Sequence, residues 1–239
     1  MKTIKNSTLF ATAGILTGIA ATASADITGA YVVSYSVTAE DFGGTSVSVN
    51  VQDLYLGSDD GADVALNVFN FIMADAGQVS YFQSFTGTGW LPNNLGVPFD
   101  TAALRSADSF VTIGGFAAGG MAEQAPGAGA GSGVDPNFGG NNAAYPGNLA
   151  GWVNSSPPSL NGQVGDVPAG PNGKEFGVLI GRFAYDGEFS LGDCGLTLEV
   201  TWNQGLGTPG QQAGFVPCPT PGALSLFGLA GIAGRRRRG

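Results

Sequence analysis

Residues 196–202 read LTLEVTW, and this stretch carries the clearest indication of the fold. Its apolar residues occupy every second position, with two threonines and Glu199 between them. A period of two is expected for a β-strand that buries one face and exposes the other. We therefore expect an inward face that ends at Trp202 and an outward face that includes Glu199.

Apolar runs of similar length recur along the chain and predict further strands. They cover residues 30–37, 45–51, 64–72, 79–85, 109–113 and 176–185. After the second run the alternation changes phase to Leu54 and Leu56, which suggests a β-bulge near Asp53. The Asp-Gly pairs at 60–61 and 186–187 separate apolar runs and predict hairpin turns. Only residues 101–107 suggest a short helical turn.

Many short strands separated by turn signals predict an all-β fold, an antiparallel β-sandwich of jelly-roll type. This body spans residues 26–216. Within it, residues 114–173 are rich in Gly, Pro and Asn, and we expect them to form a long loop region. We expect a helix on each side of the body, one in a signal segment and one in an apolar tail.

The first 25 residues have the three parts of a secretory signal peptide. Lys2 and Lys5 form a positive start, residues 9–21 form an apolar stretch without charge, and Ala23-Ser24-Ala25 matches the A-x-A cleavage pattern. The sequence therefore predicts export through the secretion machinery and cleavage between Ala25 and Asp26.

The last 23 residues, 217–239, also have three parts: a proline-rich spacer, an apolar segment over 222–234 and a basic end. The spacer includes Pro217, Cys218 and Pro219, and the basic end consists of Arg235, Arg236, Arg237 and Arg238. Basic residues after an apolar segment are retained on the cytoplasmic side of a membrane. A helix over these 13 residues would reach about 20 Å, short of a roughly 30 Å hydrocarbon core. We therefore expect transient membrane contact.

This tail resembles the PEP-CTERM sorting signal of Gram-negative bacteria, in the arginine-ended variant associated with planctomycete-like bacteria. Here Val216-Pro217-Cys218-Pro219 stands where that family has Pro-Glu-Pro. The resemblance implies recognition by an exosortase-type membrane protease and delivery to the cell surface or extracellular matrix. Phrases of the body, such as VALNVFNF at 64–71, are similar to uncharacterised surface proteins that carry the same tail.

The charge distribution restricts the possible partners. Without the two terminal signals, residues 26–216 hold three cations against eighteen carboxylates, a net formal charge of −15. Such a body repels nucleic acid and attracts divalent cations or basic surfaces. The chain has no histidine, which excludes catalytic relays and zinc sites that use this residue.

A group of three acids around a glycine, Asp59, Asp60 and Asp63, is the candidate metal site. Carboxylate oxygens are the ligands that Ca2+ prefers, so Ca2+ is the one candidate cofactor. The group does not follow the EF-hand spacing, because no Glu closes a 12-residue loop. A solvated turn is the alternative interpretation.

Two tryptophans, Trp90 and Trp152, are candidate stacking platforms for sugars because flat aromatic rings beside Gly and Asn suit carbohydrate. The alternative is that they fix glycine-rich loops onto the core. The two cysteines, Cys194 and Cys218, are a candidate disulfide because export permits oxidation. Unpaired cysteines, in a turn and in the sorting signal, are the alternative.

The sequence thus favours an exported structural or adhesive protein without catalytic activity or resident cofactor, sorted to the cell surface or matrix. Its expected partners are the export machinery, the exosortase-type protease, and exopolysaccharide or surface glycans. One alternative is a Ca2+-dependent carbohydrate-binding module that uses the acidic turn and the tryptophans. A second is a secreted enzyme acting on glycans, since two carboxylates suffice for glycoside hydrolysis.

Overall fold

The computed structural model describes residues 26–73, 81–84, 89–92, 101–114, 132–134, 149–154, 162–167, 176–186 and 196–217. These residues form two β-sheets and one short helix, and each strand pairing between them is antiparallel. The predicted all-β class is confirmed.

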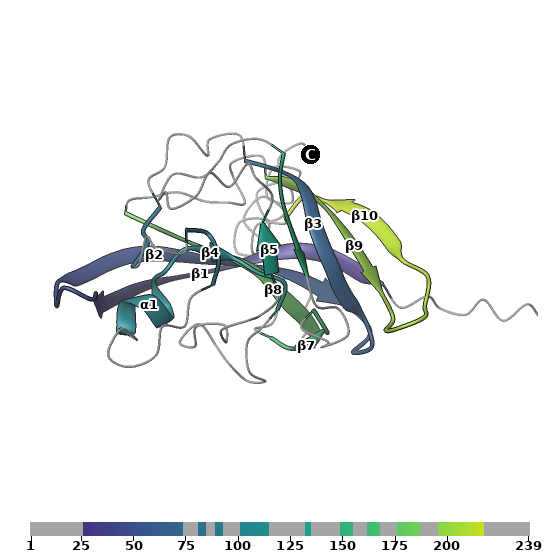
Figure 1. Ribbon diagram of the computed structural model, residues 1–239, viewed down its shortest axis with the longest axis horizontal. Coiled ribbons are helices and arrows are strands. Elements are labelled where there is room, and N and C mark those ends of the chain that lie inside the picture. Colours follow the sequence, from purple (N-terminus) through teal and green to yellow (C-terminus); the bar gives the residue numbers. More distant parts are fainter. Residues whose placement is uncertain are drawn as a thin grey trace, which may run out of the picture.

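Sheet A has the strand order β1-β2-β8-β4, with β7 also paired to β8. Its strands are β1 (Ile27–Glu40), β2 (Ser46–Ser58), β4 (Phe110–Val111), β7 (Gly165–Asp166) and β8 (Phe176–Tyr185). Strands β1 and β2 form a long hairpin, and Oδ1 of Asp41 closes its turn by accepting hydrogen bonds from the nitrogens of Gly43 and Thr45, both at 2.8 Å. The hairpin extends past β8, which pairs with β2 only from Asn50 to Gly57 (Figure 1).

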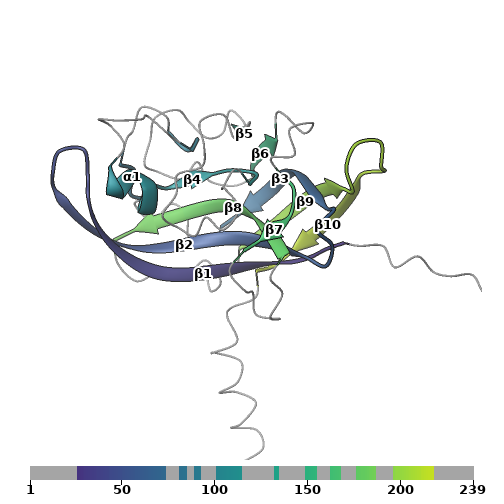
Figure 2. The ribbon, with the colours of Figure 1, turned by 90° about the horizontal axis from the view of Figure 1, so that it is seen from below.

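Sheet B has the order β10-β9-β3-β6-β5. Its strands are β3 (Val64–Ile72), β5 (Ser132–Val134), β6 (Ala150–Asn154), β9 (Thr197–Asn203) and β10 (Gln211–Phe215). Figure 2 shows β1, β2 and β8 side by side along the molecule, with the hairpin of β9 and β10 at one end.

One hydrophobic core takes side chains from both sheets. Sheet A contributes residues of β2 and β8, and sheet B contributes residues of β3, β6 and β9. The main members are Leu54, Leu56, Val178, Ile180, Phe183, Val68, Phe71, Trp152, Leu198, Val200 and Trp202. The rings of Phe183 and Phe71, one from each sheet, stack with an interplanar angle of 2° and centroids 5.9 Å apart. The hydrophobic effect therefore holds the two sheets to each other.

The other face of sheet A is also covered. Helix α1 (Ala102–Ser106) begins at Thr101, whose hydroxyl accepts a hydrogen bond from the nitrogen of Leu104 at 3.1 Å. Ala103 in the helix packs with Val51 of β2 and Ala184 of β8. The predicted helical turn at 101–107 is thus confirmed, and the second half of β2 is buried on both faces.

An irregularity lies close to the predicted bulge at Asp53, in the pairing of β2 with β8, but the extra residue is in β8 and not in β2. The register of β2 with β1 passes through Asp53 without a shift. A shift occurs instead in the pairing of β2 with β8, between Leu54 and Tyr55, where β8 has the extra residue Ile180. The alternation changes phase in β2 because inward and outward positions are both apolar there.

The predicted Asp-Gly hairpins are also corrected. The turn at 60–61 joins β2 of sheet A to β3 of sheet B, and these two strands do not pair. Likewise β8 ends before Asp186 in sheet A, whereas β9 belongs to sheet B. Both Asp-Gly pairs follow a strand, but the chain then crosses to the other sheet.

The region 114–173 contributes more than loops, because β5, β6 and β7 lie within it. Of the predicted strand at 79–85, residues 81–84 are described, and Tyr81 pairs with Tyr185 in an isolated β-bridge. Both predicted flanking helices lie outside the described residues.

Candidate functional site

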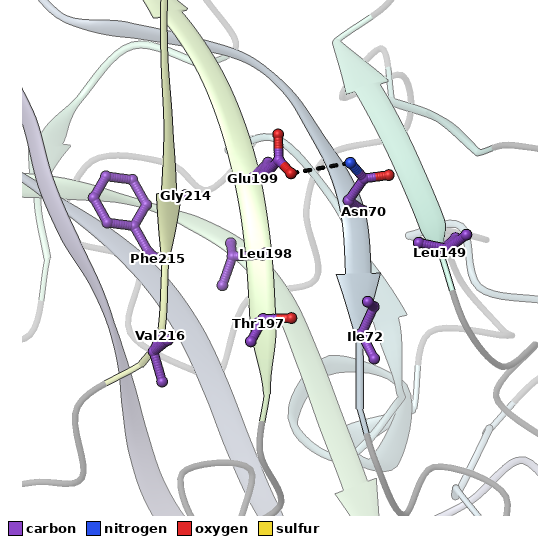
Figure 3. A pocket seen from close by; sticks show the side chains of 9 residues that line it. All are labelled: Asn70, Ile72, Leu149, Thr197, Leu198, Glu199, Gly214, Phe215 and Val216. Carbon is purple, nitrogen blue, oxygen red and sulfur yellow. Dashed lines mark hydrogen bonds between the residues drawn. The ribbon is translucent and has the colours of Figure 1, made fainter.

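A groove on the outer face of sheet B is the candidate functional site (Figure 3). Strands β3, β9 and β10 form its floor, and residue 149 before β6 forms one side. The groove has a volume of about 340 Å3. Its described lining consists of Asn70, Ile72, Leu149, Thr197, Leu198, Glu199, Gly214, Phe215 and Val216.

Glu199 lies at the centre of the groove and is held on both sides. Its Oε1 accepts a hydrogen bond from Nδ2 of Asn70 on β3 at 3.0 Å, and its Oε2 accepts one from Nε2 of Gln212 on β10 at 3.1 Å. Figure 3 shows Asn70 and Glu199 pointing toward one another. Three neighbouring strands supply these side chains, so each carboxylate oxygen has an amide partner on a different strand.

The backbone is strained at two positions of the groove. Asn70 has a φ of 47° and Leu149 a φ of 62°, and within the described ranges these are the non-glycine residues with positive φ. Asn tolerates this conformation through its short polar side chain, whereas Leu rarely adopts it. Such strain is concentrated at binding and active sites, so its presence at two groove residues supports a functional reading.

A glycine leaves the groove open next to the carboxylate. Gly214 pairs directly with Glu199 across β10 and β9, and a Cβ added there would lie 3.6 Å from the Cγ of Glu199. That distance is an ordinary van der Waals contact, so a small side chain would fit and a large one would fill the groove. The space beside Glu199 therefore depends on the absence of a side chain at 214.

The groove combines a hydrogen-bonding centre with apolar sides. The amides of Asn70 and Gln212 and the hydroxyl of Thr197 provide donors and acceptors, while Leu149 and Val216 are apolar and 55% and 65% exposed. Among the described lining residues, Glu199 is the one titratable side chain. Glycoside hydrolysis commonly uses two carboxylates, and the described lining supplies one of them.

The predicted metal site lies elsewhere, in the turn between β2 and β3. Asp63 is fully buried, and its Oδ2 accepts a hydrogen bond from the Ser58 hydroxyl at 2.6 Å. Asp60 Oδ1 accepts from the nitrogen of Ala62 at 2.9 Å, and Asp59 Oδ1 accepts from the nitrogen of Asp26 at 2.8 Å. The carboxylates of Asp59 and Asp60 thus shape the turn and hold the start of β1.

Burial raises the pKa of Asp63, its hydrogen bond from Ser58 lowers it, and the charges of Asp60, Asp59 and Asp26 raise it further. The Oδ1 of Asp63 is buried and has no hydrogen-bond partner among the residues that the structure describes. Within the described part of the chain, no three Asp, Glu or Cys side chains converge closely enough to hold a metal ion. Calcium binding by Asp59, Asp60 and Asp63 stays a prediction.

The structure corrects the stacking prediction for both tryptophans. Trp90 and Trp152 are 1% and 2% exposed, so neither presents a ring face to a sugar. Trp90 packs against Tyr81 at a centroid distance of 5.2 Å, and Trp152 Nε1 donates to the carbonyl oxygen of Thr112 at 2.9 Å. Both side chains belong to the hydrophobic core. Trp90 lies in a turn and fits the alternative, in which an aromatic side chain fixes a loop onto the core, whereas Trp152 is part of strand β6.

Several predicted site residues lie outside the described residues: Ala25, Cys194, Cys218, Pro219 and Arg235 to Arg238. The cleavage, disulfide and sorting predictions are therefore not tested at those positions. Pro217, the first residue of the predicted sorting signal, is described and buried. In the residues that the structure describes, no helix is both long and apolar enough to cross a membrane.

The groove residues were not among the predicted site residues. The alternation in LTLEVTW places Glu199 on the outward face, but Asn70 precedes it by 129 residues. A glutamate between threonines on an exposed strand face is a common solvent-facing pattern. The signal that could have found the site is Asn at 70, an uncommon residue in an apolar strand.

Comparisons with known proteins add no functional assignment. No protein-family model matches the chain, and neither the curated proteins nor the solved structures include a significant match.

Proposed function

We propose that the chain is an exported adhesive or structural protein without catalytic activity, sorted to the cell surface or extracellular matrix. Its body is a jelly-roll-like β-sandwich between a cleavable signal helix and a C-terminal apolar helix. The proposal is supported by the signal pattern of residues 1–25 and by the proline-rich, apolar and arginine parts of residues 217–239. An exosortase-type protease processes the tail.

The proposed contact surface is the groove on sheet B, and its proposed partner is a neutral, hydroxyl-rich polysaccharide of the matrix. Sugar hydroxyls both donate and accept hydrogen bonds, which matches a carboxylate flanked by amides. The apolar C–H faces of sugar rings match exposed Leu149 and Val216. A formal charge of −15 on residues 26–216 disfavours polyanionic polymers.

One observation carries this proposal: both oxygens of Glu199 are held by amides from the two neighbouring strands, at 3.0 and 3.1 Å. An acceptor fixed in this way loses little conformational entropy when it binds a hydroxyl, which favours affinity. A glutamate that only improved solubility would gain nothing from this support.

The proposal is tested by gel electrophoresis of the exported protein in gels that contain dextran, hydroxyethyl cellulose or alginate. We expect retardation by at least one neutral polymer and none by the anionic alginate. The variant Glu199→Ala should weaken the retardation at least about fivefold, the equivalent of one lost hydrogen bond. Glu40→Ala, which removes the same charge from an exposed position of sheet A, is the control. Equal retardation of both variants would count against binding of the polymer in the groove.

A further inference from the structure

The start of β1 is fixed to the acidic turn between β2 and β3. The backbone nitrogen of Asp26 donates to Oδ1 of Asp59 at 2.8 Å, and the nitrogen of Asp59 donates to the carbonyl oxygen of Asp26 at 3.4 Å. The next residue, Ile27, is 3% exposed and is paired with Ser58. The main chain at residue 26 therefore has a defined position against Asp59.

The surroundings of this nitrogen are strongly negative. Asp59, Asp60 and Asp63 lie within five consecutive residues, and Asp26 adds its own carboxylate. Burial raises the pKa of Asp63, and the charges of Asp60, Asp59 and Asp26 raise it further, so these carboxylates act on one another. A positive charge placed at the nitrogen of Asp26 would be attracted to all of them.

The predicted cleavage by signal peptidase occurs at this nitrogen. Hydrolysis of the bond between Ala25 and Asp26 adds one water molecule, which leaves a carboxylate on Ala25 and an amino group on Asp26. An α-amino group has a pKa of about 7.7–8.0, so it carries a positive charge at neutral pH. The carboxylate of Asp59 already makes this hydrogen bond charge-assisted. Conversion of the neutral amide donor to an ammonium adds the attraction between two opposite charges.

We propose that signal cleavage converts the nitrogen of Asp26 into an ammonium ion that pairs with the Asp59 carboxylate and stabilises the exported fold. Strand β1 is at the edge of sheet A, where an unsecured end is prone to fraying and to pairing with other chains. Export therefore completes the attachment of this edge strand. The inference depends on the export part of the proposed function and not on the groove.

The test uses the chain isolated after export, with its first residue established by mass spectrometry. In the Lys174→Arg background, the α-amino group is the only amine left, because the other lysines, Lys2 and Lys5, precede the cleavage site. Acetylation removes the charge of this amine, whereas reductive dimethylation keeps it. We expect acetylation to lower the melting temperature by about 3 °C at low ionic strength, and dimethylation to change it little.

The variant Asp59→Asn identifies the partner. Because Asp59 is exposed, this variant is expected to fold. Acetylation should then lower its melting temperature by less than half as much as it lowers that of the unsubstituted chain. The inference would be overturned if acetylation lowered the melting temperatures of both chains equally, or lowered neither. It would also be overturned if the first residue were not Asp26. Polysaccharide retardation measured on the same samples is independent of acetylation, so failure of the groove proposal is distinguished from failure of this one.

Discussion

Arg182 on β8 and Asp53 on β2 form an ion pair that is fully buried, with exposures of 0% and 1%. The residues are directly opposite in the antiparallel register, with Nε to Oδ1 at 2.8 Å and Nη2 to Oδ2 at 3.2 Å. Nη1 of Arg182 also donates to the carbonyl oxygen of Arg105 at 2.8 Å. The guanidinium is therefore bound on both sides, as burial of a charge requires.

The surroundings keep this pair charged. Burial lowers the pKa of Arg182, but the facing Asp53 carboxylate more than offsets this effect, and the pKa stands above its ordinary value. The Tyr35 hydroxyl donates to Oδ2 of Asp53 at 3.0 Å, and the guanidinium carbon lies 5.3 Å from the Phe110 ring centroid. Sheet A thus has a polar centre beneath helix α1.

Loss of one partner is expected to be costly. Asp53→Ala leaves a buried guanidinium without its carboxylate, and we expect the free energy of unfolding to fall by about 3–5 kcal/mol. Urea denaturation measures this difference. The double variant Asp53→Leu with Arg182→Met should recover most of the loss, since it buries no charge. A double variant no more stable than Asp53→Ala would contradict this explanation.

The hydroxyl of Tyr35 is expected to contribute less. Tyr35→Phe removes one hydrogen bond to Asp53, and we expect a loss of about 1 kcal/mol in the free energy of unfolding. Burial raises the pKa of Tyr35, as does Asp53, so the folded protein keeps this phenol protonated above about pH 10, where the unfolded chain ionises. Stability contributed by Tyr35 is therefore lost as pH rises above 10. Between pH 8 and 11, the free energy of unfolding should decrease less steeply in Tyr35→Phe than in the unsubstituted protein. Parallel curves of this free energy against pH would argue against the role of Tyr35.

Asp63 is expected to oppose folding at neutral pH. Burial raises its pKa in the folded protein, so the folded state binds the proton more tightly than the unfolded chain does. Its contribution therefore favours folding at pH values below about 3.9 and is lost as pH rises through the folded pKa. Asp63→Asn should raise the melting temperature at pH 7 and change it little at pH 3. If the melting temperature of the variant depended on pH as that of the unsubstituted protein does, the raised pKa of Asp63 would be refuted.

Gly177 is expected to be required at its position in β8. An added Cβ would clash with the carbonyl oxygen of Leu56 on the neighbouring strand and would also lie 2.9 Å from Cγ2 of Val167. The Leu56 carbonyl is part of the β2 backbone and cannot move without disturbing the sheet, so Gly177→Ala should lower the free energy of unfolding by about 1–3 kcal/mol. Gly29→Ala in β1, where nothing lies within 4 Å, is the control and should be neutral or stabilising. If both variants changed the free energy of unfolding equally, backbone entropy and not the lack of space at residue 177 would explain the effect.

The local elements of this fold could be predicted because their signals are local. The apolar runs at 64–72 and 176–185 coincide with β3 and β8, and Thr101 caps the helix where a helical turn was expected. In each case, periodicity or capping within a few residues determines the structure.

The arrangement of these elements depends on contacts between distant residues, which one sequence does not reveal. Strand β6 lies in a glycine-rich region yet pairs with β3, with Val153 opposite Asn67. Glu199 obtains its partner Asn70 in the same way, by the pairing of β9 with β3. Asp60-Gly61 has hairpin chemistry, but turn residues do not specify whether the next strand joins the same sheet.

The most direct test of the binding proposal is to fill the groove. Gly214→Leu places a large side chain beside Glu199, in an exposed strand position where a Cβ fits without a clash. Gly29→Leu puts the same side chain on sheet A, where nothing lies within 4 Å of the added Cβ. Retardation by the neutral polysaccharide should be lost for Gly214→Leu and retained for Gly29→Leu, with unchanged melting temperatures for both. Undiminished retardation of a folded Gly214→Leu protein would contradict the proposal that this groove binds the polymer.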